Sequence, residues 1–198
     1  MNVSSVLHLI RPHQYVKNFF IFLPLFFGLK ITDFSLLIDT FSAFIAFCLV
    51  ASAIYIFNDY HDIEEDKHHP KKRYRPLASG QVSKQLAIVI MTGLLCAGVG
   101  LAAVTTVKVA YIFLMYILIN IAYTFYLKHI PIADVSTIAI GFILRLFVGA
   151  TVTDTHLSMW IVIMTFLLAL FLALAKRRDD VVIYLESGKK NAKGYGWL

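Results

Sequence analysis

Charged residues are scarce in this 198-residue chain, at 15% against about 25% in soluble globular domains. Hydrophobic residues make up 59%, more than a soluble core of this size could hold. There are only two cysteines, Cys48 and Cys96, and both fall inside apolar runs, so we expect them to pack rather than to form a disulfide or a metal pair. The start of the chain, Met1 to Pro12, lacks the pattern of a removable signal peptide, and we expect none.

The long apolar runs instead indicate an all-α integral membrane protein, a multi-helix bundle with six transmembrane helices. Each run is close to the length of about 20 residues that crosses roughly 30 Å of hydrocarbon as a helix. The first run is shorter than the others and contains Pro24, which predicts a kink or a tilt. No strand-like alternation and no repeat of fixed period competes with this interpretation. The predicted spans are Tyr15–Leu29, Phe34–Phe57, Gln85–Val104, Val109–Leu127, Ile132–Ala150 and Met159–Ala175.

The basic residues predict the orientation of this bundle. The net charge is +6, and the charges lie between apolar runs, which argues against nucleic acid as a partner. Fifteen of the 18 Lys and Arg residues fall on one side of the predicted membrane, whereas Lys30 and Lys108 fall on the other. The positive-inside rule therefore places both termini and the long connection 58–84 in the cytoplasm.

An acidic segment follows the second span directly, from Asn58 to Asp66. If the helix continues, Asn58, Asp62 and Asp66 lie at i, i+4 and i+8 on one face, with Asp59 beside them. Like charges at this spacing repel, more so at a membrane margin, and a bound cation would remove the repulsion. Carboxylate and amide oxygens suit Mg²⁺, which takes substrate phosphate oxygens as further ligands.

Other interpretations of this segment remain open. The spacing is not that of a calcium-binding loop, which needs a central Gly and a terminal Glu. Zinc could bind through His61, His68 and His69, but the carboxylates outnumber them and no Cys is near. A solvated acidic loop without a metal is the simplest alternative.

A basic segment comes next and supports the metal interpretation. Five cations fall within nine residues, Lys67 to Arg75, on the same connection as the acids. Arg binds phosphate oxygens through two donors and Lys as a point charge. Topology or a lipid-headgroup patch would explain the bases alone, but neither explains why acids precede them. A metal beside a cationic loop is what a diphosphate requires.

These two segments together resemble the UbiA-type membrane prenyltransferases. The pattern Asn58-Asp59-x-x-Asp62-x-x-x-Asp66 resembles the first aspartate-rich motif of that superfamily, and Arg75-Pro76-Leu77-Ala78-Ser79-Gly80 resembles the segment after it. The resemblance implies that this motif holds magnesium and the diphosphate of a donor. It implies a catalytic role for Asp59, Asp62 and Asp66, and metal binding by Asn58, Asp62 and Asp66.

A narrower branch, the decaprenyl-phosphate phosphoribosyltransferases, fits over about residues 8–186. The matching segments are Arg11-Pro12-x-Gln14-Tyr15-x-Lys17-Asn18, His69-Pro70-x-Lys72-Arg73-x-Arg75-Pro76, Leu144-Arg145 before Gly149-Ala150, and Lys176-Arg177-Arg178. The branch has about nine spans of about 20 residues each. We therefore expect residues 1–198 to form a single UbiA-like domain, incomplete at its C-terminus. Where the branch usually carries Glu two positions after its Lys-Arg-Arg, this chain carries Asp180.

The resemblance also implies a set of residues that contact the substrate. Arg145 lies in mid-span, where a charge usually faces a cavity or a partner. We favour a cavity, with a pair to Asp134 as the alternative. Asp134 follows Pro131 at a helix start, so a capping role is as well supported as catalysis. The predicted substrate and diphosphate ligands are Lys17, Lys72, Arg73, Arg75, Tyr123, Lys128, Arg145, Lys176, Arg177 and Asp180.

The sequence thus predicts an Mg²⁺-dependent membrane transferase, in a bacterial inner membrane, with its active site facing the cytoplasm. Its expected partners are a polyprenyl lipid substrate, a phosphorylated donor and membrane lipids. The preferred reaction moves 5-phosphoribose from phosphoribosyl diphosphate to a polyprenyl phosphate. One alternative is prenyl transfer from a polyprenyl diphosphate to an aromatic acceptor. The other is an inactive truncated remnant or a non-enzymatic lipid-binding protein.

Overall fold

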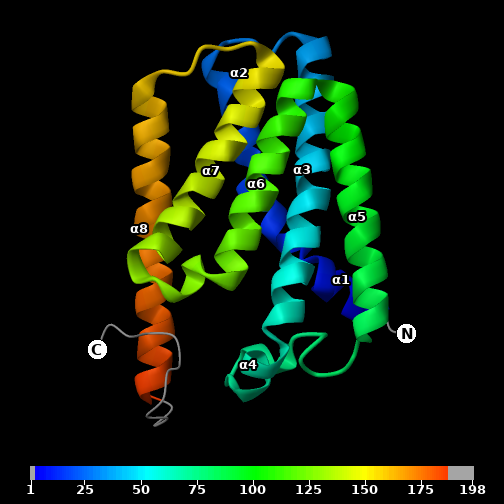
Figure 1. The fold of residues 1–198 in the computed structure, drawn as a ribbon. Helices are drawn as coiled ribbons and strands as arrows, with labels where there is room; N and C mark the ends of the chain where they lie inside the picture. Colours follow the sequence, from blue (N-terminus) through cyan, green and yellow to red (C-terminus); the bar gives the residue numbers. More distant parts are fainter. Residues whose placement is uncertain (1–2, 187–198) are drawn as a thin grey trace.

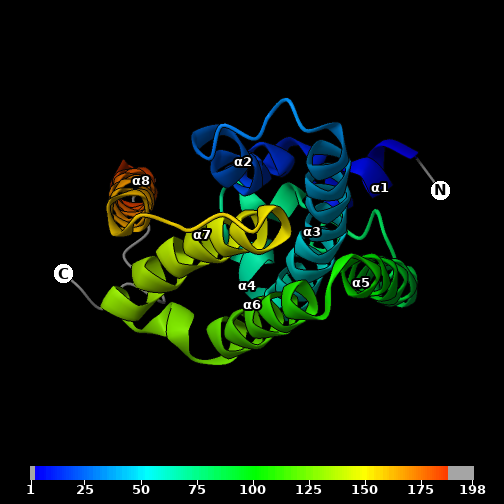
Figure 2. The same ribbon diagram turned by 90° about the horizontal axis from the view of Figure 1, so that it is seen from above.

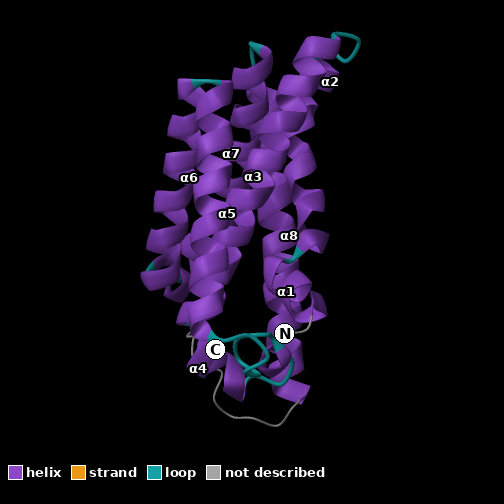
Figure 3. Cartoon of the chain, turned by 90° about the vertical axis from the view of Figure 1, so that its right-hand side faces the viewer, coloured by secondary structure: helices purple, strands orange, loops and turns teal. Residues whose placement is uncertain are grey.

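The structure, a computed structural model, describes residues 3–186, and within that range it is helical with no strand (Figures 1 and 3). The predicted all-α membrane bundle is therefore confirmed. In the described part of the chain, five helices are long and apolar enough to cross a membrane. They are α3 (Phe34–His61), α5 (Lys84–Thr105), α6 (Val107–Phe125), α7 (Pro131–Thr153) and α8 (Met159–Glu186).

The first predicted span, Tyr15–Leu29, is wrong as a membrane-length α-helix. The chain forms α1 (Val3–Ile10), then a 3-10 helix η1 (Pro12–Phe22) and the short α2 (Leu23–Phe27). A 3-10 helix rises about 2.0 Å per residue, so the 11 residues of η1 cover about 22 Å. An α-helix of that length would cover about 16 Å. The segment therefore still runs from the end of the bundle that holds α1 to the end that holds α2 (Figure 1).

Polar residues at the ends of the apolar runs determine where the long helices begin. The Asp33 side chain accepts hydrogen bonds from the backbone N–H groups of Ser35 and Leu36, which starts α3. Ser83 and Thr106 cap α5 and α6 in the same way. These caps satisfy backbone donors that a helix start leaves unpaired.

The core of the bundle is built on α3, whose membrane-length window is 67% buried, against 17% for α5 and α8. Phe47 of α3 packs edge-on against Phe113 of α6 at 5.1 Å between ring centroids. Small residues permit close contacts elsewhere, since a Cβ on Gly149 of α7 would collide with the backbone oxygen of Ile21 in η1. Seen from above, α8 lies at one side of the bundle beside α7, and α5 lies at the opposite side beside α3 (Figure 2).

The connections gather the polar residues at one end of the bundle. That end holds α1, the short α4 (Ile63–His68) and the C-terminal part of α8, whereas α2 and the starts of α3 and α6 lie at the other (Figure 1). The 3-10 turns η2 (Lys72–Tyr74) and η3 (Leu127–His129) complete the connections after α4 and α6. The acidic and basic segments of the sequence therefore lie at the same end as α1 and η3.

Candidate active site at the acidic end of the bundle

The acidic motif lies where α3 ends. The helix stops at His61, and Asp62 has φ −90° and ψ 6°, which turns the chain into α4. Helical hydrogen bonds continue across this turn, from Asp62 N to Asn58 O at 2.9 Å and from Asp66 N to Asp62 O at 2.8 Å. The i, i+4, i+8 spacing is thus kept in the backbone, but the turn at Asp62 changes where the side chains point.

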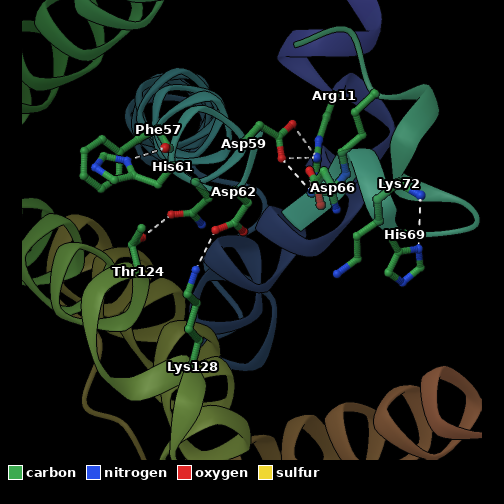
Figure 4. A network of polar contacts seen from close by, with 12 residues as sticks. Arg11, Phe57, Asp59, His61, Asp62, Asp66, His69, Lys72, Thr124 and Lys128 are labelled. Atoms are coloured by element: carbon green, nitrogen blue, oxygen red, sulfur yellow. Dashed lines mark hydrogen bonds and ion pairs between the residues drawn. The ribbon is translucent and has the colours of Figure 1, made fainter. Parts of the chain in front are cut away.

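Asn58 and Asp62 face the end of α6 and the turn after it. The Thr124 hydroxyl donates a short hydrogen bond to Asn58 Oδ1. The ammonium of Lys128, in η3, lies 2.5 Å from Asp62 Oδ1 (Figure 4). The side chains of Lys128 and Asp62 are 18% and 22% exposed, so this pair borders solvent.

Asp59 and Asp66 face a second set of cations. Arg11 Nη2 contacts both oxygens of Asp59, at 2.6 and 2.5 Å (Figure 4). Arg75 Nη1 bridges Asp59 at 3.0 Å and Asp66 at 2.6 Å. Both acids are only 3% exposed. Burial raises the pKa of Asp66 above its ordinary value, while the charge of Arg75 opposes that shift.

The acidic residues therefore divide between two partner sets instead of converging on one point, which corrects the expectation of a single face. Among the residues that the structure describes, no group of three His, Cys, Asp or Glu side chains is placed to hold a metal ion. The donor chemistry nevertheless fits Mg²⁺, which typically binds through one or two carboxylates and takes waters and phosphate oxygens as its other ligands. In this structure Arg11, Arg75 and Lys128 supply the positive charge beside Asp59, Asp62 and Asp66 that a bound metal would also supply.

A further ion pair joins α7 to α8 near the same end. Arg177 Nε and Nη2 contact Asp134 at 2.5 and 2.6 Å, and Tyr123 donates its hydroxyl hydrogen to Asp134 Oδ1 at 2.8 Å. Asp134 lies in the first turn of α7, as expected, but its side chain is used for this pair and for Tyr123. The structure thus brings Tyr123 and Arg177 together through Asp134, for which the sequence left helix capping and catalysis as alternatives.

Arg145 does not pair with Asp134. It is 4% exposed in the middle of α7, where Nε donates to Asn18 Oδ1 at 2.8 Å and Nη1 to the carbonyl oxygen of Gly141 at 2.7 Å. Its guanidinium also lies over three aromatic rings, with centroid distances of 4.7 to 5.4 Å. Cation–π contact and hydrogen bonds offset the cost of placing this charge at depth. A contact of Arg145 with substrate remains a prediction.

The other predicted ligands lie on several elements. Lys72 and Arg73 are in η2, where the Arg73 guanidinium lies 4.8 Å from the centroid of the Tyr74 ring. Lys17 is half-buried on η1, and Lys176 is exposed on α8. The side chain of Asp180 lies outside the described residues. Substrate contact by these residues also remains a prediction.

Two residues of the site escaped the sequence-based list of ligands. Arg11 binds Asp59 from 48 positions away, and Thr124 binds Asn58 from 66 positions away. For Arg11 a signal existed, because it opens the Arg-Pro motif that carries the resemblance. Thr124 had no signal beyond its place next to Tyr123, since a Thr near a helix end is common.

The comparisons with known proteins identify the family. The model of the UbiA prenyltransferase family matches residues 20–190. The chain belongs to the UbiA prenyltransferase family, and the resemblance predicted from the sequence is confirmed.

Relatives within the family carry the name of the narrower branch. The decaprenyl-phosphate phosphoribosyltransferase of Corynebacterium glutamicum is 34% identical over 194 residues, which cover 96% of this chain and 58% of the relative. The protein of the same name from Mycolicibacterium smegmatis is 32% identical over 195 residues, covering 96% of this chain and 61% of the relative. The chain thus spans less than two thirds of the length of these relatives.

A solved structure shows the same fold. The UbiA homologue from Archaeoglobus fulgidus, bound to GPP and Mg²⁺, superposes with a TM-score of 0.75 at 20% identity. The match covers 94% of this chain and 67% of that protein. The two proteins therefore share the same fold over this region.

Proposed function

We propose that the chain carries the donor site of a magnesium-dependent transferase that moves 5-phosphoribose from phosphoribosyl diphosphate to a polyprenyl phosphate. The observation that carries the proposal is the alternation of acids and bases at one end of the bundle. Lys128 lies against Asp62, and Arg75 lies against both Asp59 and Asp66. Relatives named decaprenyl-phosphate phosphoribosyltransferase at 32–34% identity support the choice of donor and acceptor.

Asn58 and Asp62 would hold the metal through their side-chain oxygens, and Asp66 would join them after its contact with Arg75 breaks. The chemistry that magnesium supplies when bound is stabilisation of the negative charge on a leaving diphosphate. Lys128 and Arg75, released from their carboxylates, would then turn to the diphosphate oxygens. Each cation would exchange one anionic partner for another, so little charge is left unpaired in a partly dehydrated site.

The bases of η2, and Arg75 directly after it, would complete the electrostatic stabilisation. Lys72, Arg73 and Arg75 carry three positive charges within four residues, and Arg offers planar, two-donor contacts to phosphate. A polyprenyl phosphate acceptor is already an anion and needs no strong general base to attack the sugar carbon. Catalysis would therefore rest mainly on positioning and on charge stabilisation of the leaving group.

We infer that this end faces the cytoplasm of a bacterial inner membrane. Support comes from the positions of the cations, since Arg11, Lys72 and Lys128 lie at the end that carries the acids. Lys30 lies at the opposite end, where its ammonium contacts the carbonyl oxygens of Thr153 and Asp154. The positive-inside rule then orients the bundle.

Prenyl transfer from a prenyl diphosphate to an aromatic acceptor is the second candidate. The observation in its favour is the family itself, whose model is that of prenyltransferases. The same acids and bases would hold the diphosphate, and an aromatic carbon would attack instead of a phosphate oxygen.

The test compares the two donors on the purified protein in detergent. We expect isothermal titration calorimetry to give tighter binding of phosphoribosyl diphosphate than of geranyl diphosphate, and only with magnesium present. Tighter binding of geranyl diphosphate would favour prenyl transfer. Binding of neither donor by a folded chain would favour the non-enzymatic interpretation.

A further inference from the structure

A surface pocket of about 490 Å³ lies beside the acidic site, between the N-terminal helix and the basic connection. One wall comes from α1 and the residues just after it, and the other from the connection 71–81. Basic, hydroxyl and amide side chains dominate the lining, and no Asp or Glu is among these described residues. The lining consists of Ser4, Ser5, His8, Arg11, His13, Lys71, Tyr74, Arg75, Pro76 and Gln81.

The two walls are joined directly, so the pocket is a built feature of the fold. The Ser5 hydroxyl donates to Gln81 Oε1 at 3.0 Å across 76 positions of sequence. Ser5 is 8% exposed, which places this bond in the interface between α1 and the connection. At the far end of α1, Arg11 is tied to Asp59 of α3. The pocket is thus fixed at both ends of its α1 wall.

The two arginines of the lining bind the acidic site through one nitrogen each. Arg11 uses Nη2 for Asp59, and Arg75 uses Nη1 for Asp59 and Asp66. Within the described part of the chain, the other nitrogens of these guanidiniums make no hydrogen bond. The side chains are 19% and 26% exposed, so these donors remain accessible to a ligand. The lining holds three cations, Arg11, Arg75 and Lys71, but the two arginines pair with only two carboxylates, so net positive charge remains in the pocket.

The backbone holds Arg11 in an unusual conformation. Its φ of 58° and ψ of 56° lie in the left-handed region, which a residue with a long side chain rarely adopts. This single residue joins α1 to η1 and turns the chain sharply between them. This conformation keeps the guanidinium of Arg11 between the pocket and Asp59. If α1 continued as a helix through Arg11, the side chain would point in another direction.

We propose that this pocket binds a phosphate group, with Arg11, Arg75 and Lys71 as its main contacts. Val3 and Leu7 of α1 are 68% and 53% exposed, and they lie one helical turn apart on the same face. Exposed apolar residues beside a basic pocket at the end of a membrane bundle fit a lipid surface. The expected source of the phosphate is therefore the headgroup of an anionic phospholipid, and the alternative source is a soluble phosphate.

The test measures lipid binding without magnesium, so that the acidic site takes no part. Short-chain phosphatidylglycerol, phosphatidylcholine and inorganic phosphate are each titrated into the purified protein in neutral detergent with a chelator, and binding is followed by microscale thermophoresis. Lys71→Glu should weaken phosphatidylglycerol binding about tenfold, the scale of one charge-assisted contact. Lys67→Glu makes the same charge change in the neighbouring α4, outside the pocket, and it should change the affinity less than twofold.

The three ligands separate the possible sources. Tighter binding of phosphatidylglycerol than of phosphatidylcholine, lost in Lys71→Glu alone, supports a lipid headgroup. The same pattern with inorganic phosphate only supports a soluble phosphate at the same pocket. Equal affinity for the two lipids without phosphate binding, or equal losses in the two variants, would overturn the proposal. Because the assay contains no magnesium and no donor, its result is independent of the proposed transferase activity.

Discussion

At the scale of residues, the site is a set of ion pairs, several of which join distant parts of the chain. Asp62 meets Lys128 across 66 positions, and Asp59 meets Arg11 across 48. Each acid is partly or fully removed from water, so its charge needs a partner in the absence of a ligand. The basic partners neutralise the charge of the acids and also carry the positive charge that an anionic donor requires.

Removing the carboxylate of Asp62 should abolish most magnesium-dependent donor binding. In Asp62→Ala, Asn58 loses its companion ligand and Lys128 loses its carboxylate. We expect the affinity for phosphoribosyl diphosphate with magnesium to fall at least tenfold, which corresponds to the loss of about 1.5–3 kcal/mol for a contact to a charged group. Isothermal titration calorimetry in detergent measures the change.

Glu64→Ala provides the matched control for Asp62→Ala. Glu64 lies in the same acidic segment and is also paired with a lysine, Lys67, at 2.8 Å. Its side chain is 74% exposed and does not face Lys128 or Arg75. The control should keep its affinity, and equal losses in the two variants would contradict the assignment of the site.

The pair between Arg177 and Asp134 should contribute to stability. Asp134 is 4% exposed, so Arg177→Ala leaves a buried carboxylate with only Tyr123 as a partner. We expect a loss of about 2–3 kcal/mol, less than for a fully buried pair because the Arg177 side chain is 22% exposed. Thermal unfolding in detergent measures it. Arg178→Ala removes an exposed charge from the next position, and this control should unfold within about a degree or two of the parent protein. Equal shifts of the unfolding temperature in the two variants would contradict a specific contribution of the Arg177–Asp134 pair.

At the scale of elements, glycines determine how closely the helices approach. A Cβ on Gly98 of α5 would lie 2.7 Å from Val50 Cγ2 and 2.8 Å from the Ala46 backbone oxygen of α3. A Cβ on Gly100 of the same helix would meet no atom within 4 Å. The two positions are only two residues apart, yet only Gly98 faces the neighbouring helix.

Gly98→Ala should therefore destabilise the bundle, and Gly100→Ala should not. Overpacking against the α3 backbone costs about 1–3 kcal/mol, since a backbone oxygen cannot move aside as a flexible side chain can. The Gly100 variant gains helix propensity of up to about 1 kcal/mol. Unfolding temperatures in the same detergent should fall for the first variant and stay level or rise for the second. A fall of similar size in both would show that α3 and α5 do not pack at Gly98.

The first apolar segment crosses the bundle mainly as the 3-10 helix η1. Its apolar run is short for an α-helical span, and Pro24 interrupts it. The chain solves this by adopting a 3-10 helix, which covers more height per residue. Close contact with α7 supports that conformation, because Gly149 admits the backbone of η1 at Ile21. The sequence pattern indicated the apolar segment but not the type of helix.

At the scale of the whole molecule, orientation follows from where the charges gather. Cysteine labelling of cells with a membrane-impermeant maleimide tests it, on a Cys96→Ala background that keeps the buried Cys48. Val107→Cys, at the start of α6, should react in intact cells because Val107 is 66% exposed at the end away from the acids. Glu65→Cys, in α4, should react only after the membrane is permeabilised. Labelling of Glu65→Cys in intact cells would place the acidic site outside.

The sequence by itself determined the membrane class, five of the helices and the family. Long apolar runs and capping residues are local signals, because a helix satisfies its own backbone and a bilayer requires that length. The acidic motif was equally local, since its ligand types follow each other at helical spacing. These features need no knowledge of what lies beside them.

Only the tertiary structure decided which charges meet. Arg145 bonds Asn18 rather than Asp134, Asp134 bonds Arg177, and Arg11 closes onto Asp59. A turn at Asp62 directs the acids toward two different sets of bases, which regular spacing could not reveal. Charge pairing in a bundle depends on how separate helices pack and rotate, and that depends on the sum of many small contacts distributed over the whole chain.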